Sequence, residues 1–314
     1  METELKVDLY AVCWNERDML PFFFEHYDPV VDRYFIYDDG SDDGTLDLLR
    51  DHPKVVTCAF PRTVRGSFVG SQQDFQNEVW KSSRGEADWV IVTAIDEHIT
   101  FKPGLTKDHL HIYMSAGATL IPALGYEMIA GILPATECSL SRSIGTGVFA
   151  PKYNKLSLFR PDRIKETGFS PGRHRAFPTG DLKIAPWDEL MLLHYRHVGF
   201  ERTFKRNLDL AARLGQVDRA NRWGGHYDRS REVFREHWHQ LEAAAHDVRA
   251  DDFRAWSHAP VKWRWWRAED FVDPGPPWDV SEQKPNGPAA PRPGPQPTPV
   301  LASLDRDPLV AGDS

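Results

Sequence analysis

The stretch RYFIYDDGSDDGT, residues 33–45, decides the fold that we predict for this chain. Residues 33–37 form an apolar run of strand length, which stops at a turn with four aspartates and two glycines. A short helical segment, residues 45–51, follows directly. A strand, a polar turn and a helix in this order are the repeating unit of a parallel α/β sheet.

The same order repeats on both sides of this stretch. Apolar runs of strand length occupy residues 6–13, 54–60 and 89–95, and residues 71–82 have the spacing of an amphipathic helix. Asn15 is a candidate N-cap for a helix after the first strand. The order β-α-β-α-β-α-β predicts a mostly parallel sheet with helices on both faces, and ligands bind beyond the carboxyl ends of such strands.

The second half of the chain has a less regular pattern. Residues 119–124 are a further strand candidate, and residues 139–186, rich in Gly, Pro, Arg and Ser, are predicted to form loops around a site. Residues 201–214 and 231–245 have helical patterns. The aromatic-rich stretch 256–266 is predicted to close the core, with an acceptor-binding patch and a membrane-surface patch as alternatives.

Composition divides the chain into three predicted parts. Prolines recur every two or three residues after Asp273, so the end of the chain is expected to be extended or disordered, with a proline-recognition protein as its candidate partner. The parts are an α/β domain in residues 1–215, a helical and aromatic extension in 216–272, and a proline-rich tail in 273–314.

Composition also limits the classes of function. The 314 residues carry 38 Lys and Arg against 46 Asp and Glu, a formal charge of −8, which disfavours general nucleic-acid binding. No apolar run approaches the roughly 20 residues that span a bilayer, and the start lacks the cationic region of a signal peptide. The three cysteines are too scattered for a disulfide framework. We therefore expect a cytoplasmic protein, and peripheral contact with a membrane is left open.

Polar clusters follow the predicted strands. They occupy residues 13–16 (CWNE), 38–45, 96–98 (DEH) and, far downstream, 194–197 (HYRH). An EF-hand is excluded at residues 38–45 because no glutamate stands at its twelfth position and no helix precedes it. At a strand end, carboxylates accept hydrogen bonds from a nucleobase or a ribose. The carboxylates and imidazole of residues 96–98 fit Mg²⁺ or Mn²⁺ held together with substrate phosphates.

Together these segments resemble a known enzyme family. The succession CWNE, PFFFEHY, VDRYFIYDDGSDDGT, DWVIVTAIDEHI and LLHYRHVGFERTFKRN is similar to family 2-like glycosyltransferases with the GT-A fold, in the subgroup with W-N-E and D-x-D-E motifs. The similarity spans about residues 6–214. It implies a GT-A-like, Rossmann-type domain in residues 1–215. Such a domain moves a sugar from a nucleoside-diphosphate sugar, by default a UDP-sugar, to a glycan or other hydroxyl acceptor in polysaccharide biosynthesis.

The resemblance also implies which residues bind the donor. The W-N-E motif and the acidic turn match the positions expected at the nucleotide-binding strand end and near base and ribose. Arg160, Arg173 and Arg175 are candidates to neutralise phosphate charge, and His174 lies in a segment that also resembles the family. These implied donor-binding residues are Trp14, Asn15, Glu16, Asp38, Asp39, Asp42, Arg160 and His174.

The metal site departs from the family pattern. Asp96 matches the last acid of D-x-D, but Ala94 stands in place of the first. An Mn²⁺ or Mg²⁺ ion is therefore expected to rely on Asp96, His98 and His194. An inverting reaction also needs a general base. The candidate bases are Asp181, Asp188 and Glu189, with Glu127 as a further one, and Lys205 and Arg206 are candidate phosphate contacts.

Two other functions stay open at this point. The first alternative is a non-catalytic nucleotide-sugar-binding or scaffold protein, because Ala94 replaces the first acid of the metal motif. In that case the proline-rich tail of the chain would be the docking element. A nucleotidyltransferase on a similar sheet is the other alternative. It ranks last because the turn CWNERD lacks the glycines that cradle a triphosphate.

Overall fold

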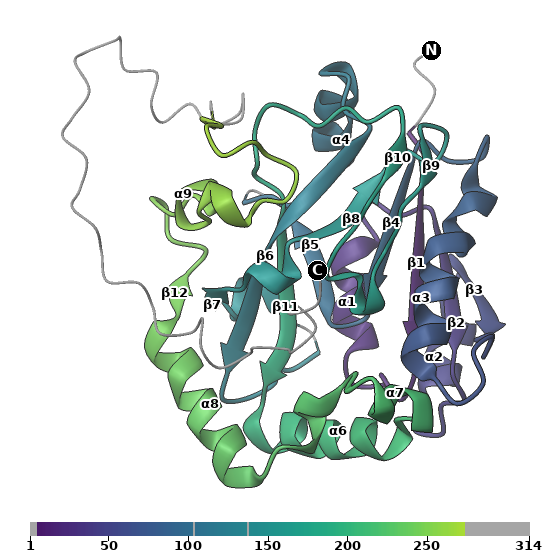
Figure 1. Cartoon of the computed structure of the whole chain (residues 1–314), viewed down its shortest axis with the longest axis vertical. Coiled ribbons are helices and arrows are strands. Elements are labelled where there is room, and N and C mark those ends of the chain that lie inside the picture. The colour runs from purple at the N-terminus through teal and green to yellow at the C-terminus, as the bar shows by residue number, and fades with distance from the viewer. Residues whose placement is uncertain (1–4, 103, 137, 274–314) are drawn as a thin grey trace, which may run out of the picture. The chain divides into compact units, whose positions relative to one another are not determined.

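The central feature of the fold is a ten-stranded mixed sheet (Figure 1). The computed structural model describes residues 5–102, 104–136 and 138–273. The main path of the sheet has the order β12-β7-β6-β8-β4-β1-β2-β3, and β11 pairs with β5 and β6. The strands are β1 (Val7–Cys13), β2 (Arg33–Asp38), β3 (Val55–Ala59), β4 (Trp89–Ala94), β5 (Glu97–Thr100), β6 (Leu120–Ala130), β7 (Thr146–Phe149), β8 (Lys155–Phe159), β11 (Met191–Val198) and β12 (His246–Asp247). A separate pair joins β9 (Ile164–Glu166) and β10 (Thr179–Gly180).

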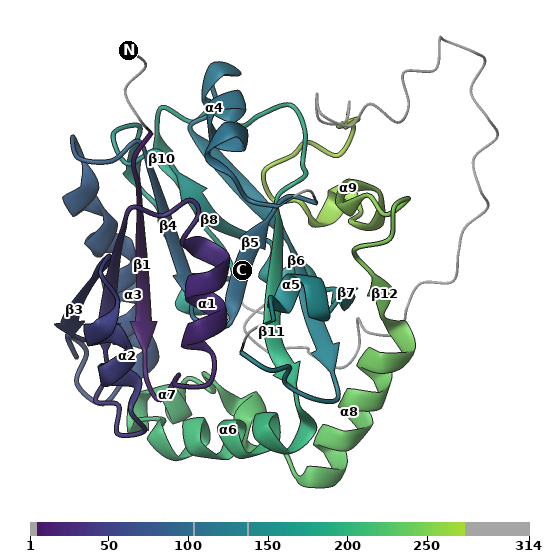
Figure 2. The ribbon, with the colours of Figure 1, turned by 180° about the vertical axis from the view of Figure 1, so that it is seen from behind.

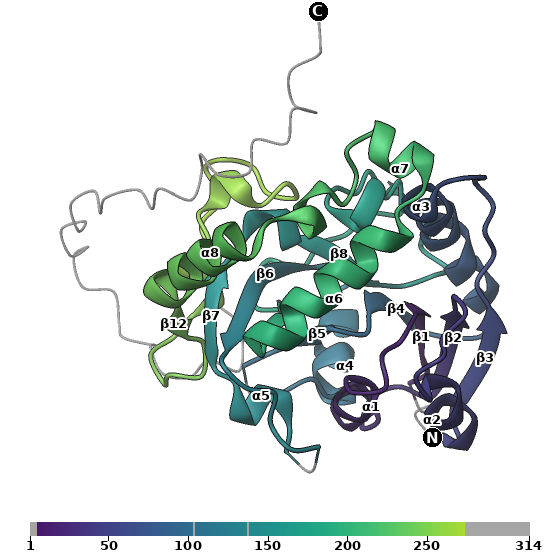
Figure 3. The same cartoon turned by 90° about the horizontal axis from the view of Figure 1, so that it is seen from below.

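The first half of the chain forms the predicted parallel layer. Strands β4, β1, β2 and β3 are parallel neighbours, and β4, buried at every position but its last, lies near the centre of the whole sheet. Helices α1 (Leu20–Tyr27) and α2 (Thr45–Asp51) cover one face, and α3 (Phe68–Glu78) covers the other (Figure 3). This arrangement confirms the α/β sheet with helices on both faces, and it places the carboxyl ends of β1, β2 and β4 at one edge.

Beyond β4 the sheet becomes mixed. Strand β8 runs antiparallel to both β4 and β6, and β11 runs parallel to β6. The prediction that residues 139–186 are loops was therefore wrong for β7 and β8. The segment KLSLF of β8 is buried at every position. It was not predicted as a strand because it is short and lies in a stretch rich in Gly, Pro and Ser.

The prediction that Asn15 caps helix α1 was also wrong. The N-cap of α1 is Met19, Pro21 lies in the first turn, and Asn15 has a left-handed backbone with φ of 51°. The Asn15 side chain instead joins the turn after β1 to the turn after β2, as described below.

Helix α6 (Phe200–Arg213) follows β11 and crosses the carboxyl edge of the sheet (Figure 2). Helix α7 (Gln216–Ala220) is tied to the start of α3 by the buried carboxylate of Asp218, which accepts bonds from the Phe68 N–H at 2.8 Å and the Gly215 N–H at 3.1 Å. The α6–α7 segment is therefore connected to β11 at one end and hydrogen-bonded to the start of α3 at the other. The other helices are α4 (Lys107–Ser115), α5 (Leu140–Ser143), α8 (Arg231–Ala244) and α9 (Ala255–His258), and the 3₁₀ turns are η1 (Val79–Ser83), η2 (Pro151–Tyr153), η3 (Pro171–Arg173), η4 (Gly225–Asp228) and η5 (Val261–Trp263).

The described residues belong to one compact unit. The predicted boundary at residue 215 lies between α6 and α7, and the division into domains stays a prediction. The predicted tail, residues 273–314, lies outside the described residues except for Asp273. Cys13, Cys58 and Cys138 are free thiols. Within the described ranges, no helix is both long and apolar enough to cross a membrane.

Candidate active site

The turns after β1 and β2 are locked together at the carboxyl edge. The Asn15 side-chain amide donates to Asp42 Oδ1 at 2.8 Å, and the Asp42 backbone N–H donates back to Asn15 Oδ1 at 2.9 Å. The Glu16 N–H donates to Thr45 Oγ1 at 2.9 Å. Asn15 and Asp42, both predicted to bind the donor, thus bind each other and shape the edge.

The two adjacent aspartates of the acidic turn have different surroundings. Asp38 Oδ2 accepts bonds from the N–H groups of Gly40 and Ser41 at 2.9 and 3.0 Å, while its buried Oδ1 has no hydrogen-bond partner. Asp39 instead pairs with Arg62 and with Arg213 of α6, whose nitrogen lies 2.5 Å from Asp39 Oδ2. The turn therefore offers one carboxylate with an unused oxygen and one that is already paired.

Arginines of α6 contact the W-N-E motif. Arg213 lies 3.8 Å and Arg206 4.9 Å from the ring centroid of Trp14. Arg206 also donates to the Trp14 carbonyl at 2.8 Å and pairs with the Glu16 carboxylate. Arg206 and Arg213 are seven residues apart and so share a helix face. That spacing in the sequence is the signal that could have identified Arg213.

Glu16 connects this motif with Asp96. Burial raises the pKa of Glu16 to about 7, Arg206 lowers it, and the negative charge of Asp96 raises it. A carboxyl group that titrates near neutrality exchanges protons readily at physiological pH. The charge of Asp96, after β4, therefore influences the protonation of Glu16, after β1.

Asp96 and His194 form the pair predicted for the metal. Asp96 Oδ2 lies 3.2 Å from His194 Nε2, and the Asp96 side chain keeps 31 % exposure. Burial raises the pKa of Asp96, but His194, Arg206 and Arg196 outweigh it and hold the pKa below its usual range. The fold therefore brings an ionised carboxylate and an imidazole together from chain positions that are 98 residues apart.

A buried ion cluster lies beside this pair. The Glu97 carboxylate pairs with Lys155 at 2.5 Å and with Arg173, and all three side chains are at most 5 % exposed. Burial raises the pKa of Glu97, yet Lys155 and Arg173 lower it to about 2. One carboxylate with two cations leaves an excess positive charge close to Asp96, which favours an anion in this place.

Glu127 joins the same cluster of residues. It is opposite His194 in the β6–β11 register, its Oε1 lies 3.7 Å from Lys152 Nζ, and it lies 3.9 Å from His197 Nδ1. Burial raises the pKa of Glu127, but Lys152, His197 and Arg196 hold it below its usual range. Glu127 is thus an ionised carboxylate next to the Asp96–His194 pair.

The turn η2 forms the rim of this region. The Tyr153 ring centroid lies 4.4 Å from that of His194 and 5.7 Å from that of His174. His174 also hydrogen-bonds the Lys152 carbonyl through Nδ1 at 2.9 Å. The predicted donor residue His174 therefore lies at the rim. Lys152 and Arg196 were not among the predicted site residues. Lys152 is a single cation in a short turn without a motif, whereas Arg196 lies in β11 within the HYRH cluster, which could have identified it.

His98 does not join Asp96 and His194. Its ring is fully buried, stacks on His26 at 4.6 Å and packs against Tyr195 at 5.0 Å, and neither ring nitrogen has a hydrogen-bond partner. Burial lowers the pKa of His98 well below its usual value. His98 follows Glu97 in β5, so its side chain points to the opposite face of the sheet. We therefore leave it out of the proposed metal site.

Arg160 and Asp181 lie at the opposite edge of the sheet. Strand β8 is antiparallel to β4, with Phe159 opposite Val90, so its carboxyl end meets the start of β4. The Arg160 N–H donates to the Thr119 carbonyl at 2.8 Å, and the Thr119 hydroxyl donates to the Asp181 carbonyl at 2.6 Å. Both assignments are corrected because the antiparallel direction of β8 was not predicted.

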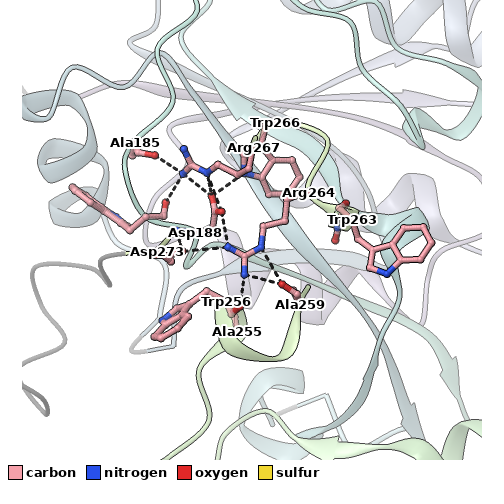
Figure 4. Close-up of polar contacts among 12 residues, drawn as sticks. Ala185, Asp188, Ala255, Trp256, Ala259, Trp263, Arg264, Trp266, Arg267 and Asp273 are labelled. Atoms are coloured by element: carbon pink, nitrogen blue, oxygen red, sulfur yellow. Dashed lines mark hydrogen bonds and ion pairs between the residues drawn. The ribbon is translucent and has the colours of Figure 1, made fainter. Parts of the chain in front are cut away.

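Asp188 and Glu189 are also remote from the pair, because they precede β11 whereas His194 lies within it. Asp188 is 3 % exposed and binds Arg264 at 3.0 Å, Trp266 Nε1 at 2.8 Å and Arg267 at 2.8 Å (Figure 4). Glu189 is 5 % exposed. These positions do not suit a general base for chemistry at Asp96, so both assignments are corrected.

A cavity of about 340 Å³ lies beside the acidic turn. It is lined by Arg62, Val64, Arg65, Gly66, Ser67, Phe68 and Gly215, and the guanidinium of Arg62, the partner of Asp39, lies 4.9 Å from the Phe68 ring centroid. An aromatic ring and two arginines next to an aspartate are suited to a planar, anionic ligand.

The predicted metal site would have two protein ligands at most in the part of the chain that the structure describes. No three His, Cys, Asp or Glu side chains there form a group able to hold a metal ion. Ala94 ends β4 without a ligand atom. Asp96 and His194 fit a divalent cation whose other ligands are substrate phosphates and water, as is common for Mg²⁺.

Comparisons with known proteins give a weak likeness in fold. No family model matches the chain, and no curated relative matches it. Three solved structures are similar at low TM-scores. They are 4-diphosphocytidyl-2C-methyl-D-erythritol synthase (13 % identity, 51 % of this chain, 78 % of that chain, TM-score 0.29), a putative nucleotide-diphospho-sugar transferase from Desulfovibrio desulfuricans G20 (10 %, 76 %, 97 %, 0.31) and the galactosyltransferase LgtC with donor and acceptor sugar analogs (12 %, 49 %, 58 %, 0.24). Likenesses at these scores assign no function to this chain, and membership of glycosyltransferase family 2 stays a prediction.

Proposed function

We propose that this protein is a glycosyltransferase that uses a nucleoside-diphosphate sugar as its donor. One observation carries the proposal: the carboxyl edge brings the W-N-E motif, the acidic turn and the Asp96–His194 pair together, with arginines beside each. Acidic and aromatic groups suit a nucleoside, and cations suit a diphosphate. A UDP-sugar remains the donor expected from the motifs.

In this proposal the nucleoside lies at the end of β2, between Asp38 and the cavity beside Arg62. Asp38 Oδ1 is buried without a partner, so it is the oxygen available to a donor N–H or O–H. The diphosphate then lies along the edge toward Asp96. There Arg196, Arg206 and Lys152 stabilise the negative charge that develops on the leaving group.

Asp96 and His194 would hold the divalent cation, with oxygens of the diphosphate completing its shell. When bound, the cation would neutralise the departing nucleoside diphosphate. Glu127 is the remaining candidate base by its position, because it lies next to His194. Burial raises its pKa, but Lys152, His197 and Arg196 outweigh burial and lower the pKa, and so weaken it as a proton acceptor. It would accept the proton of the acceptor hydroxyl if the reaction inverts the anomeric carbon.

The test combines ligand-induced stabilisation with turnover. UDP, GDP, CDP and dTDP are added with and without Mn²⁺ to the wild type and to Asp96→Asn, and release of nucleoside diphosphate from the matching sugar donor is followed. One nucleotide at 100 times Kd should stabilise the wild type by about 2.7 kcal/mol. Asp96→Asn should lose the metal-dependent part and about 10²–10³ of the rate.

The matched control is Asp181→Asn, the same substitution at an exposed residue of the opposite edge, which should change neither quantity. A shift with a nucleotide but no turnover with any sugar donor would favour the non-catalytic binding protein that Ala94 keeps in play. No shift with any nucleotide would refute the donor site.

A further inference from the structure

We propose that Trp263 and Trp265 form a platform that binds a sugar ring of the acceptor, so that the acceptor is a glycan longer than one sugar. This inference rests on the proposed function and goes beyond it by naming the acceptor class and its subsite.

The platform stands out among the aromatic residues. Trp263 is 47 % and Trp265 is 38 % exposed, and among the described tryptophans they are the two in the exposed class. Large indole side chains usually bury most of their surface, and exposed ones mark binding sites more often than scattered aliphatic residues do. The exposure therefore calls for a ligand of matching shape.

The fold holds the platform in place from below. Along residues 263–266, Arg264 and Trp266 point inward to Asp188, while the intervening Trp263 and Trp265 point outward. In Figure 4 the Trp263 indole points away from the cluster around Asp188. Arg267 adds a further pair of bonds to Asp188. The outward indoles are thus attached to a rigid buried ion cluster, which lowers the entropic cost of binding.

The platform is also tied to the candidate active site. Trp265 Nε1 donates to the Asn154 carbonyl at 3.0 Å, and the Asn154 amide donates to the Trp263 carbonyl at 2.9 Å. Asn154 follows Tyr153, whose ring packs on His194. The platform is therefore connected to His194 through the Tyr153–Asn154 turn. Because its anchor Asp188 lies at the edge away from Asp96, a ligand on the platform would be a distal sugar of the acceptor and not the reacting one.

The charge around the platform favours a sugar over a membrane. Arg264 and Arg267 are occupied by Asp188, so the exposed charges of residues 262–270 are Lys262 against Glu269 and Asp270. An anionic membrane surface attracts clusters of basic residues, which this segment lacks. Lys262 Nζ lies 5.6 Å from the Trp263 ring centroid. A pyranose ring can present C–H groups to the exposed indole surface and a hydroxyl oxygen to this ammonium group.

The experiment uses the full chain and a panel of cello-, malto- and chitotetraose with their monosaccharides. Binding is measured by saturation-transfer NMR with the preferred nucleoside diphosphate present. At least one tetrasaccharide should bind the wild type. The double variant Trp263→Ala/Trp265→Ala should weaken it at least 10-fold, and Trp263→Phe/Trp265→Phe should restore most of the affinity. Val233→Ala, an equally exposed residue on α8, is the control and should bind as the wild type does.

Three outcomes would overturn the platform. The first is that no tetrasaccharide binds while the nucleotide still raises Tm. The second is equal binding by the double alanine variant. The third is that vesicles of phosphatidylcholine and phosphatidylglycerol bind the wild type and not the double variant, which would make the surface a membrane contact. If the nucleotide raises no Tm either, the proposed function itself fails, so the two failures are distinguishable.

Discussion

Asp96 and Asp188 lie at the two edges of the sheet and show how differently one fold uses an aspartate. Asp188 receives bonds from two arginines and a tryptophan, and 3 % of it is exposed. The Asp96 side chain faces one imidazole and keeps 31 % exposure. The oxygens of Asp188 are all hydrogen-bonded, so this carboxylate holds chain segments together. The carboxylate of Asp96 is partly exposed and lies near the positive charges of Arg206 and Arg196, so it is available to a ligand.

The comparison first predicts a large stability effect at Asp188. Asp188→Ala removes the carboxylate partner of Arg267 and leaves the buried Arg264 with the carboxylate of Asp273 alone, at 3.4 Å, and it should lower the free energy of unfolding by about 3–5 kcal/mol. Urea denaturation measures the effect. Asp181→Ala, whose carboxylate is exposed, should change it by no more than about 0.5 kcal/mol. A loss below about 1 kcal/mol for Asp188→Ala would break the comparison.

A second substitution tests how the turn η2 is seated at the active edge. A Cβ at Gly125 would lie 2.4 Å from the backbone carbon of Tyr153. Gly125→Ala should therefore push the turn away from His194 and cost about 1–3 kcal/mol of stability, together with much of the transfer rate. Gly131→Ala is the matched control, since its Cβ would meet nothing within 4 Å. Both are measured by thermal unfolding and product release, and unchanged transfer in Gly125→Ala would contradict the placement of the rim.

The smallest expected effect is on the pH dependence of stability, which should have opposite signs for Glu16 and Glu97. Burial raises the pKa of Glu16 to about 7, so the folded state prefers its protonated form. The stability that this contributes is present below pH about 4.5 and is lost as the pH rises through about 7. Relative to Glu16→Gln, the wild-type Tm should therefore fall by roughly 2–4 °C between pH 5 and 8.

Glu97 has the opposite sign. Its pKa of about 2 in the folded state means that its contribution is present above the ordinary glutamate pKa and is lost as the pH falls toward 2. Glu236→Gln, on the exposed surface of α8, serves as the control for both. A rise of the wild-type Tm with pH relative to Glu16→Gln would show that Arg206, and not burial, dominates the Glu16 environment.

Sequence patterns predicted the parallel half of the fold closely. Residues 45–51 form α2 as expected, and β1, β2, β3 and β4 lie within about one residue of the predicted strands. Each of these elements is defined locally, by an apolar run and a polar turn. For the same reason the residues that follow these strands, Trp14–Glu16, Asp38–Asp39 and Asp96, do gather at one edge.

The tertiary structure alone decided the rest. Whether β8 runs up or down the sheet depends on contacts with β4 and β6 that are distant in the chain, and this direction moved Arg160 and Asp181 to the far edge. The partners of Asp188, Arg264 and Arg267, follow it by more than seventy residues. The sequence determines which side chains can be ionised or stacked. The environment that makes Asp188 a structural ion-pair partner and Asp96 a candidate ligand arises only when distant segments come together.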